Sequence, residues 1–134
     1  MKLEDYFDID GTYELVDGLY NVKGSVLLRS SKKFEKLPVK FGKVTDYFFC
    51  SYNKLRSLEG CPKWVGGYFS CDNNNLTSLK GAPKFVGGDF FCFGNYLKTL
   101  EGCPQHIGVE FKCDYNLHNN KEYRQYLIMK KLRV

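Results

Sequence analysis

The chain has 134 residues and a formal net charge of +5, which is enough for one hydrophobic core and allows an acidic partner without requiring one. It has no run of about 18 apolar residues, and its first residues, MKLEDYF, lack the basic start and apolar core of a signal peptide. We therefore expect one domain, residues 1–134, located in the cytoplasm and not at a membrane. There, its six cysteines are expected to pack as small apolar side chains instead of forming disulfides.

Residues 1–25 look irregular, although they retain a degenerate form of a 21-residue repeat that is clearer later in the chain. When this segment is aligned through Gly18, Tyr13 and Val16 fall at positions that hold inward-facing leucines in later units. Terminal repeats are atypical because they must close the hydrophobic core against water. The sequence therefore predicts a degenerate N-terminal cap over residues 1–25.

Within this cap, residues 8–12 read DIDGT and resemble the nucleophile motif of haloacid-dehalogenase-type phosphotransferases. In that family the first aspartate attacks phosphorus and a magnesium ion neutralises charge. The chemistry also needs a distal lysine, a serine or threonine and an acidic metal pair, whereas everything downstream here is repeat. An EF-hand fits no better, because the glutamate required at the twelfth loop position is missing. An Asp/Gly turn is the favoured interpretation.

From residue 26 onward the chain is a tandem repeat. The stretch LEGCPKWVGGYFSCDNNNLTSL, residues 58–79, returns 21 residues later as LKGAPKFVGGDFFCFGNYLKTL, and looser copies lie on either side. A fixed period of this length indicates stacked structural units. We expect repeats over residues 26–118, beginning with a strand at Val26–Leu28. The period is most visible in four cysteines and four asparagines: Cys50, Cys71, Cys92, Cys113, Asn53, Asn74, Asn95 and Asn116.

Each unit divides into a strand, a turn and a return leg. Phenylalanine and cysteine alternate at period two, as in Phe69 and Cys71, which is typical of a short half-buried strand. Asn74 follows where the chain turns, and an amide there can bond backbone groups and form a ladder through the stack. Leu76 and Leu79 then point inward. A Gly-Cys-Pro or Gly-Ala-Pro step gives an extended or 3-10 return leg, and a Gly-Gly pair turns the chain into the next strand.

The unit F-x-C-x-x-N-x-L-x-x-L resembles the second half of the leucine-rich-repeat signature, with Phe and Cys in two leucine positions. The spacing is similar to that of short bacterial effector-type repeats, and the tandem VGG-x-F-x-C-x-x-N-x-L units also resemble small proteins of tailed bacteriophages. This resemblance implies a leucine-rich-repeat solenoid with a curved parallel sheet of five or six short strands and irregular or 3-10 return legs. A phage-like origin further implies a bacterial host protein as partner, such as a defence protein, and action in the host cytoplasm.

Residues 119–134 differ in composition from the repeats, because they contain no Gly or Pro. Asn119 and Asn120 are candidate N-caps, an acidic residue follows in the first turn, and basic residues end the segment, which are the start and stop signals of a helix. Apolar residues on one side, including Tyr123 and Tyr126, would cover the open end of the core. We predict a C-terminal capping helix; a homodimer interface or a partner-binding helix is the alternative.

No residue cluster in the sequence favours catalysis or metal binding. The four strand cysteines point the same way from adjacent strands, so they cannot converge on a tetrahedral zinc site. His106 and His118 have no partner constellation, and the sequence lacks a phosphate loop, a Ser–His–Asp set and an H-E-x-x-H motif. We expect a protein that is not an enzyme and that uses no metal or cofactor.

The residues at the outward positions of the strands are not expected to pack in the core. These positions hold aromatic residues with a few charged residues around them, together with Ser51 and Ser70. A contiguous aromatic patch usually marks an interaction site, and this composition matches a protein–protein hot spot. Two alternatives remain open. Single-stranded nucleic acid could stack on the rings, although the acidic residues would repel it, or chain segments could bury the patch in a purely structural or self-associating protein. The predicted partner-binding residues of this concave face are Tyr47, Phe49, Tyr52, Tyr68, Asp72, Asn73, Asp89, Phe91, Phe93, Tyr96, Lys112 and Tyr115.

Overall fold

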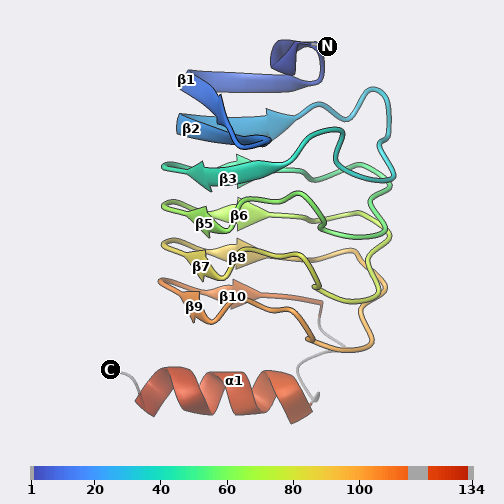
Figure 1. Ribbon diagram of the computed structural model, residues 1–134. Coiled ribbons are helices and arrows are strands. Elements are labelled where there is room, and N and C mark those ends of the chain that lie inside the picture. The colour runs from blue at the N-terminus through green and yellow to red at the C-terminus, as the bar shows by residue number, and fades with distance from the viewer. Residues whose placement is uncertain (1, 115–120, 133–134) are drawn as a thin grey trace.

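The computed structural model describes residues 2–114 and 121–132, and it shows a parallel β-solenoid followed by a helix (Figure 1). Strands of successive coils pair in parallel, for example Phe48 with Phe69 and Phe69 with Phe90, which confirms the predicted 21-residue unit. The elements are η1 (Leu3–Asp5), β1 (Phe7–Val16), β2 (Leu19–Leu28), β3 (Phe41–Val44), β4 (Phe48–Phe49), β5 (Trp64–Val65), β6 (Phe69–Ser70), β7 (Phe85–Val86), β8 (Phe90–Phe91), β9 (His106–Ile107), β10 (Phe111–Lys112) and α1 (Lys121–Leu132).

Two ladders of parallel strands start from the long strand β2. The second half of β2 pairs with β4, and this ladder continues through β6 and β8 to β10. The first half of β2 pairs with β3, and that ladder continues through β5 and β7 to β9. The first ladder is the predicted sheet of short parallel strands. The second ladder is an addition, because its residues belong to the predicted return legs.

The two ladders lie on opposite sides of the core, so the solenoid has two outward surfaces (Figure 1). Each coil passes between them through a corner such as Gly66-Gly67, and the flanking Val65 and Phe69 both point into the core. In the middle coils this corner requires glycine, because a Cβ on Gly87 would overlap the carbonyl oxygen of Gly66 one coil earlier. We call the outward side of β4, β6, β8 and β10 face A, and the outward side of β3, β5, β7 and β9 face B.

Phenylalanine side chains form a continuous row through the core. Phe48, Phe69 and Phe90 are fully buried, and neighbouring rings stack with centroids 5.7 and 5.3 Å apart. Edge-to-face contacts extend the row to Phe41 at one end and to Phe111 at the other. Removing these rings from water is a large stabilising contribution. The predicted inward leucines and strand cysteines are buried in the same core: Leu55, Leu58, Leu76, Leu79, Leu97, Leu100, Cys50, Cys71, Cys92 and Cys113.

The predicted asparagine ladder is confirmed for Asn53, Asn74 and Asn95, whereas Asn116 lies outside the described residues. Asn74 shows the pattern: its Nδ2 donates to the carbonyl oxygens of Cys50 (3.1 Å) and of its own coil, and its Oδ1 accepts from the backbone N–H of Leu55 (3.0 Å). One amide therefore satisfies buried backbone groups in two successive coils.

Between residues 29 and 114 the return legs contain no α-helix, as predicted, and no 3-10 helix either; three of them begin with a β-turn. In Leu58-Glu59-Gly60-Cys61 the N–H of Cys61 donates to the carbonyl oxygen of Leu58 (3.0 Å), and Gly60 has a φ of 93°. A positive φ at the third position is the type II arrangement, which favours glycine. The same turn recurs at residues 79–82 and 100–103.

Residues 7–28 form an antiparallel hairpin, so the prediction of an irregular first segment is wrong. β1 pairs with β2 along its whole length, and the two-residue loop Asp17-Gly18 has positive φ at both positions, 52° and 79°. This is typical of a type I′ hairpin turn. Tyr13 and Val16 are 38% and 44% exposed, which contradicts their predicted inward placement.

The motif at residues 8–12 lies inside β1, so the predicted Asp/Gly turn is also wrong. Gly11 faces Gly24 in the pairing register, and both have a φ above 120° that lets the hairpin bend between face B and face A. The carboxylate of Asp8 pairs with Arg29 at 2.8 Å. These residues serve the hairpin structure.

Helix α1 lies across the last coil of the solenoid (Figure 1). Tyr123 is buried and meets the ring of Phe111 edge to face at 5.6 Å, and Tyr126 meets the same ring at 5.2 Å. The predicted C-terminal capping helix is thereby confirmed, while its candidate N-caps Asn119 and Asn120 lie outside the described residues.

Alkylation is expected to distinguish Cys103 from the other five cysteines, which are all buried. Burial raises the pKa of the Cys61, Cys71 and Cys92 thiols well above the usual range and that of Cys113 to about 11. Because the thiolate is the reactive form, iodoacetamide at pH 8 should modify the native protein at Cys103 first and all six cysteines after unfolding. Intact-mass spectrometry measures this, and rapid native modification of Cys71 or Cys92 would contradict the core packing.

Candidate protein-binding surface

Face A carries adjacent rows of outward side chains. Across neighbouring strands, Phe49 pairs with Ser70, Ser70 with Phe91 and Phe91 with Lys112. A second row begins two residues earlier, at Tyr47, and therefore points to the same side of the sheet. Because neighbouring strands are about 4.8 Å apart, side chains within a row can touch.

Contacts join four of the predicted residues into a continuous surface. The rings of Tyr47 and Tyr68 stack with centroids 4.8 Å apart and planes 2° apart. Tyr68 meets Phe91 edge to face at 6.1 Å, and Nζ of Lys112 lies 5.3 Å from the centre of the Phe91 ring. All four side chains are half-buried, so each retains exposed surface. Desolvation raises the pKa of the Tyr68 hydroxyl above its usual value.

The acidic end of face A lies beside this aromatic surface. Asp89 occupies the position of Tyr68 one coil later, and its carboxylate accepts from the backbone N–H of Glu110 at 3.0 Å. The Glu110 carboxylate lies 3.6 Å from the ammonium group of Lys112. Phe49 is half-buried at the opposite end of the row, and Tyr115 lies outside the described residues.

The expectation that Ser51 and Ser70 are outward and free is wrong. They are 2% and 1% exposed, and one hydrogen bond of 2.7 Å joins their two hydroxyl groups. Ser70 also donates to the carboxylate of Asp72 at 3.2 Å. Because both side chains are buried, they contribute packing and not recognition surface.

Four more predicted residues line the turn that follows the face A strands. Tyr52 and Asn73 are exposed at equivalent positions with positive φ, 59° and 57°, where the next coil has Gly94. Phe93 and Tyr96 are also exposed. These side chains extend the aromatic surface past the ends of the strands.

Asp72 has a structural role that the sequence analysis did not foresee. Its carboxylate accepts from the backbone N–H of Phe93 at 2.7 Å, and the Asp114 carboxylate accepts from the N–H of Gly94 at 2.7 Å. Two aspartates thus hold one turn from the coils on either side. Desolvation raises the pKa of Asp72, while hydrogen bonds from Phe93 and Ser70 act in the opposite direction.

Face B carries an aromatic row that the sequence analysis missed. Trp64, Phe85 and His106 follow one another in register, and their rings stack with centroids 5.1 and 4.7 Å apart. Nζ of Lys43 lies 4.3 Å from the Trp64 ring and covers its outer face. The 21-residue recurrence of rings just before buried Val or Ile was the available signal.

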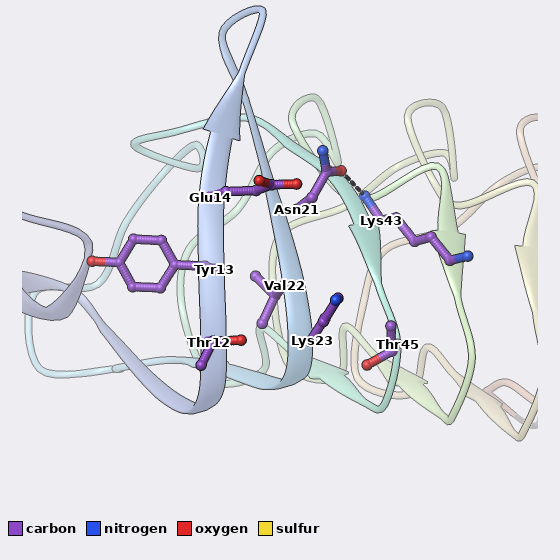
Figure 2. Close-up of a pocket in the computed structure, with 8 residues that line it drawn as sticks. All are labelled: Thr12, Tyr13, Glu14, Asn21, Val22, Lys23, Lys43 and Thr45. Atoms are coloured by element: carbon purple, nitrogen blue, oxygen red, sulfur yellow. Dashed lines mark hydrogen bonds between the residues drawn. The ribbon is translucent and has the colours of Figure 1, made fainter.

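A groove of about 470 Å³ adjoins this row where β1, β2 and β3 meet (Figure 2). The side-chain oxygen of Asn21 accepts a hydrogen bond from the backbone N–H of Lys43 at 2.9 Å. This bond gives a partner to a backbone group at the β-bulge between β2 and β3, where the ladder is interrupted. Figure 2 shows Glu14 and Lys43 on one side of the hairpin, while Tyr13 projects from the other side.

Within the part of the chain that the structure describes, no three His, Cys, Asp or Glu side chains gather as metal ligands. None of the described helices is long and apolar enough to cross a membrane. No protein family, curated protein or solved structure matches the chain in sequence or structure comparisons.

Proposed function

We propose that the protein is a non-catalytic binding module that recognises another protein through the aromatic surface of face A. The observation that carries this proposal is the unbroken contact series Tyr47, Tyr68, Phe91 and Lys112 on a parallel sheet. Aromatic anchors that are already held in place lose little conformational freedom on binding, and they are the residues that dominate protein–protein hot spots.

The ring geometry favours a protein over single-stranded nucleic acid. Tyr47 and Tyr68 stack on each other with nearly parallel planes, so each ring already uses a face that a base would need. The exposed edges and tyrosine hydroxyls suit apolar side chains and backbone carbonyls instead. Asp89 and Glu110 on the same face would repel a phosphate backbone.

The resemblance of the repeat units to short leucine-rich repeats of bacterial effectors and tailed bacteriophages gives this proposal a more specific form. On that analogy the protein is a phage-type inhibitor or adaptor, and its partner is a protein of the bacterial host, such as a defence protein, in the host cytoplasm. Fold resemblance alone does not determine function, so the partner must be identified by binding.

The double variant Phe91→Ala/Phe93→Ala is expected to reduce partner recovery by more than about tenfold, because it removes two adjacent anchors. Its thermal midpoint should stay nearly unchanged, since neither ring belongs to the buried core. The measurement is a pull-down from bacterial host lysate with quantitative mass spectrometry, paired with a thermal melt of each variant.

The matched control is Leu15→Ala/Val16→Ala, which truncates two exposed apolar residues of the hairpin. It should leave recovery unchanged. Equal losses in the two double variants would contradict recognition through face A, and so would a large fall in the midpoint of the Phe91/Phe93 variant. Salt-sensitive retention on single-stranded DNA would favour the nucleic-acid alternative.

A further inference from the structure

Face B holds a row of stacked rings that the proposed function does not use. The row covers four successive coils, and each member stacks against the next, in the order Lys43, Trp64, Phe85 and His106. Three strand spacings separate the ends of this row, or about 14 Å. Four residues of an extended chain cover a similar length, at about 3.3 Å per residue.

Exposed lysines accompany the row. Lys63 and Lys84 immediately precede Trp64 and Phe85, and Lys23 and Lys43 line the adjoining groove. Glu14 is the only acidic residue among the eight described residues that line this groove. Face B is therefore basic where face A is acidic, and the two faces call for partners of different charge.

We infer that face B is a second docking site, and that its occupant is an acidic, extended protein segment. Carboxylates of the segment pair with Lys63 and Lys84, while its apolar side chains lie against the ring edges of Trp64 and Phe85. The stacked geometry decides between this occupant and single-stranded nucleic acid. Lys43 covers the outer face of Trp64, and Phe85 lies between Trp64 and His106, so these rings offer edges and not faces to a base.

Trp64 is the one tryptophan of the chain, so its fluorescence reports directly on face B. The test titrates a ten-residue peptide with equal numbers of glutamate and leucine residues into the full chain and follows Trp64 emission. A saturable change is expected. In the variant Lys63→Glu/Lys84→Glu the dissociation constant should rise at least about tenfold, because two attractive contacts become repulsive.

The control is Lys36→Glu/Lys98→Glu, which alters net charge equally at exposed positions outside face B. It should bind the peptide as the parent does, and circular dichroism should show that every variant keeps its fold. No change of Trp64 emission with this glutamate–leucine peptide would overturn the inference. Equal weakening in the control, or tighter binding of an oligothymidine of equal charge, would also overturn it. Face A variants should leave this titration unaffected, which separates the inference from the proposed function.

Discussion

Replacing Phe69 with alanine is expected to lower the free energy of unfolding by about 3–5 kcal/mol, the range found for truncating a buried phenylalanine. Phe69 is fully buried and stacks on a phenylalanine in the coil before and in the coil after, at 5.7 and 5.3 Å. The cavity would interrupt the ring row in the middle of the array, where neither cap can close over it. Urea denaturation followed by circular dichroism measures the loss.

Phe91→Ala is the matched control. Phe91 pairs with Ser70, which follows Phe69 in β6, so Phe91 lies on the outward side of the sheet. Its side chain is half-buried, and its described contacts are with Tyr68 and Lys112. We expect a loss of about 1 kcal/mol or less. A loss from Phe91→Ala as large as that from Phe69→Ala would show that the two faces of the strand are assigned wrongly.

Asn74→Ala is expected to cost about 3 kcal/mol, although it removes no apolar surface. The variant leaves the N–H of Leu55 and the carbonyl oxygen of Cys50 without their partner inside the core. Each buried backbone group that loses its hydrogen bond costs about 1–3 kcal/mol. The measurement is again the midpoint and slope of urea denaturation.

Asn75→Ala provides the comparison for this variant, since the adjacent Asn75 is exposed. It should change the free energy of unfolding by no more than about 0.5 kcal/mol. Similar losses from the two alanine variants would mean that the asparagine ladder contributes nothing specific. A loss confined to Asn74→Ala would show that side-chain amides, as well as ring stacking, hold the coils together.

The sequence was sufficient to predict the core of the repeats because two periods agree there. Alternation at period two places Phe69 and Cys71 on one side of a strand, and recurrence after 21 residues places the same residues in every coil. The 21-residue recurrence alone places Leu76 and Leu79 in the core, and both are buried as predicted.

The N-terminal hairpin was missed although a local signal for it was present. Asp17-Gly18 between apolar residues favours a two-residue hairpin turn, but aligning Gly18 with the repeat glycines hid that signal. The 21-residue period predicts inward positions for Tyr13 and Val16, whereas β1 pairs antiparallel and follows a different register. A cap does not repeat, so the period gives no information about it.

The candidate surfaces were predictable only in part. Outward positions such as Tyr47 and Phe91 follow from strand alternation, but alternation gives Ser70 the same outward position, although it is buried and hydrogen-bonded to Ser51 and Asp72. Trp64 and Phe85 on face B were missed because a leg containing proline and glycine suggests irregular backbone, and pairing with neighbouring coils still makes short strands there.

Site-specific photo-crosslinking tests the central claim most directly. We predict that p-benzoylphenylalanine in place of Phe91 will crosslink a host protein from bacterial lysate. The same probe in place of Lys98, an exposed residue outside face A, should give no such adduct. An adduct from position 98 alone, or from neither position, would contradict the account of face A as the protein-binding surface.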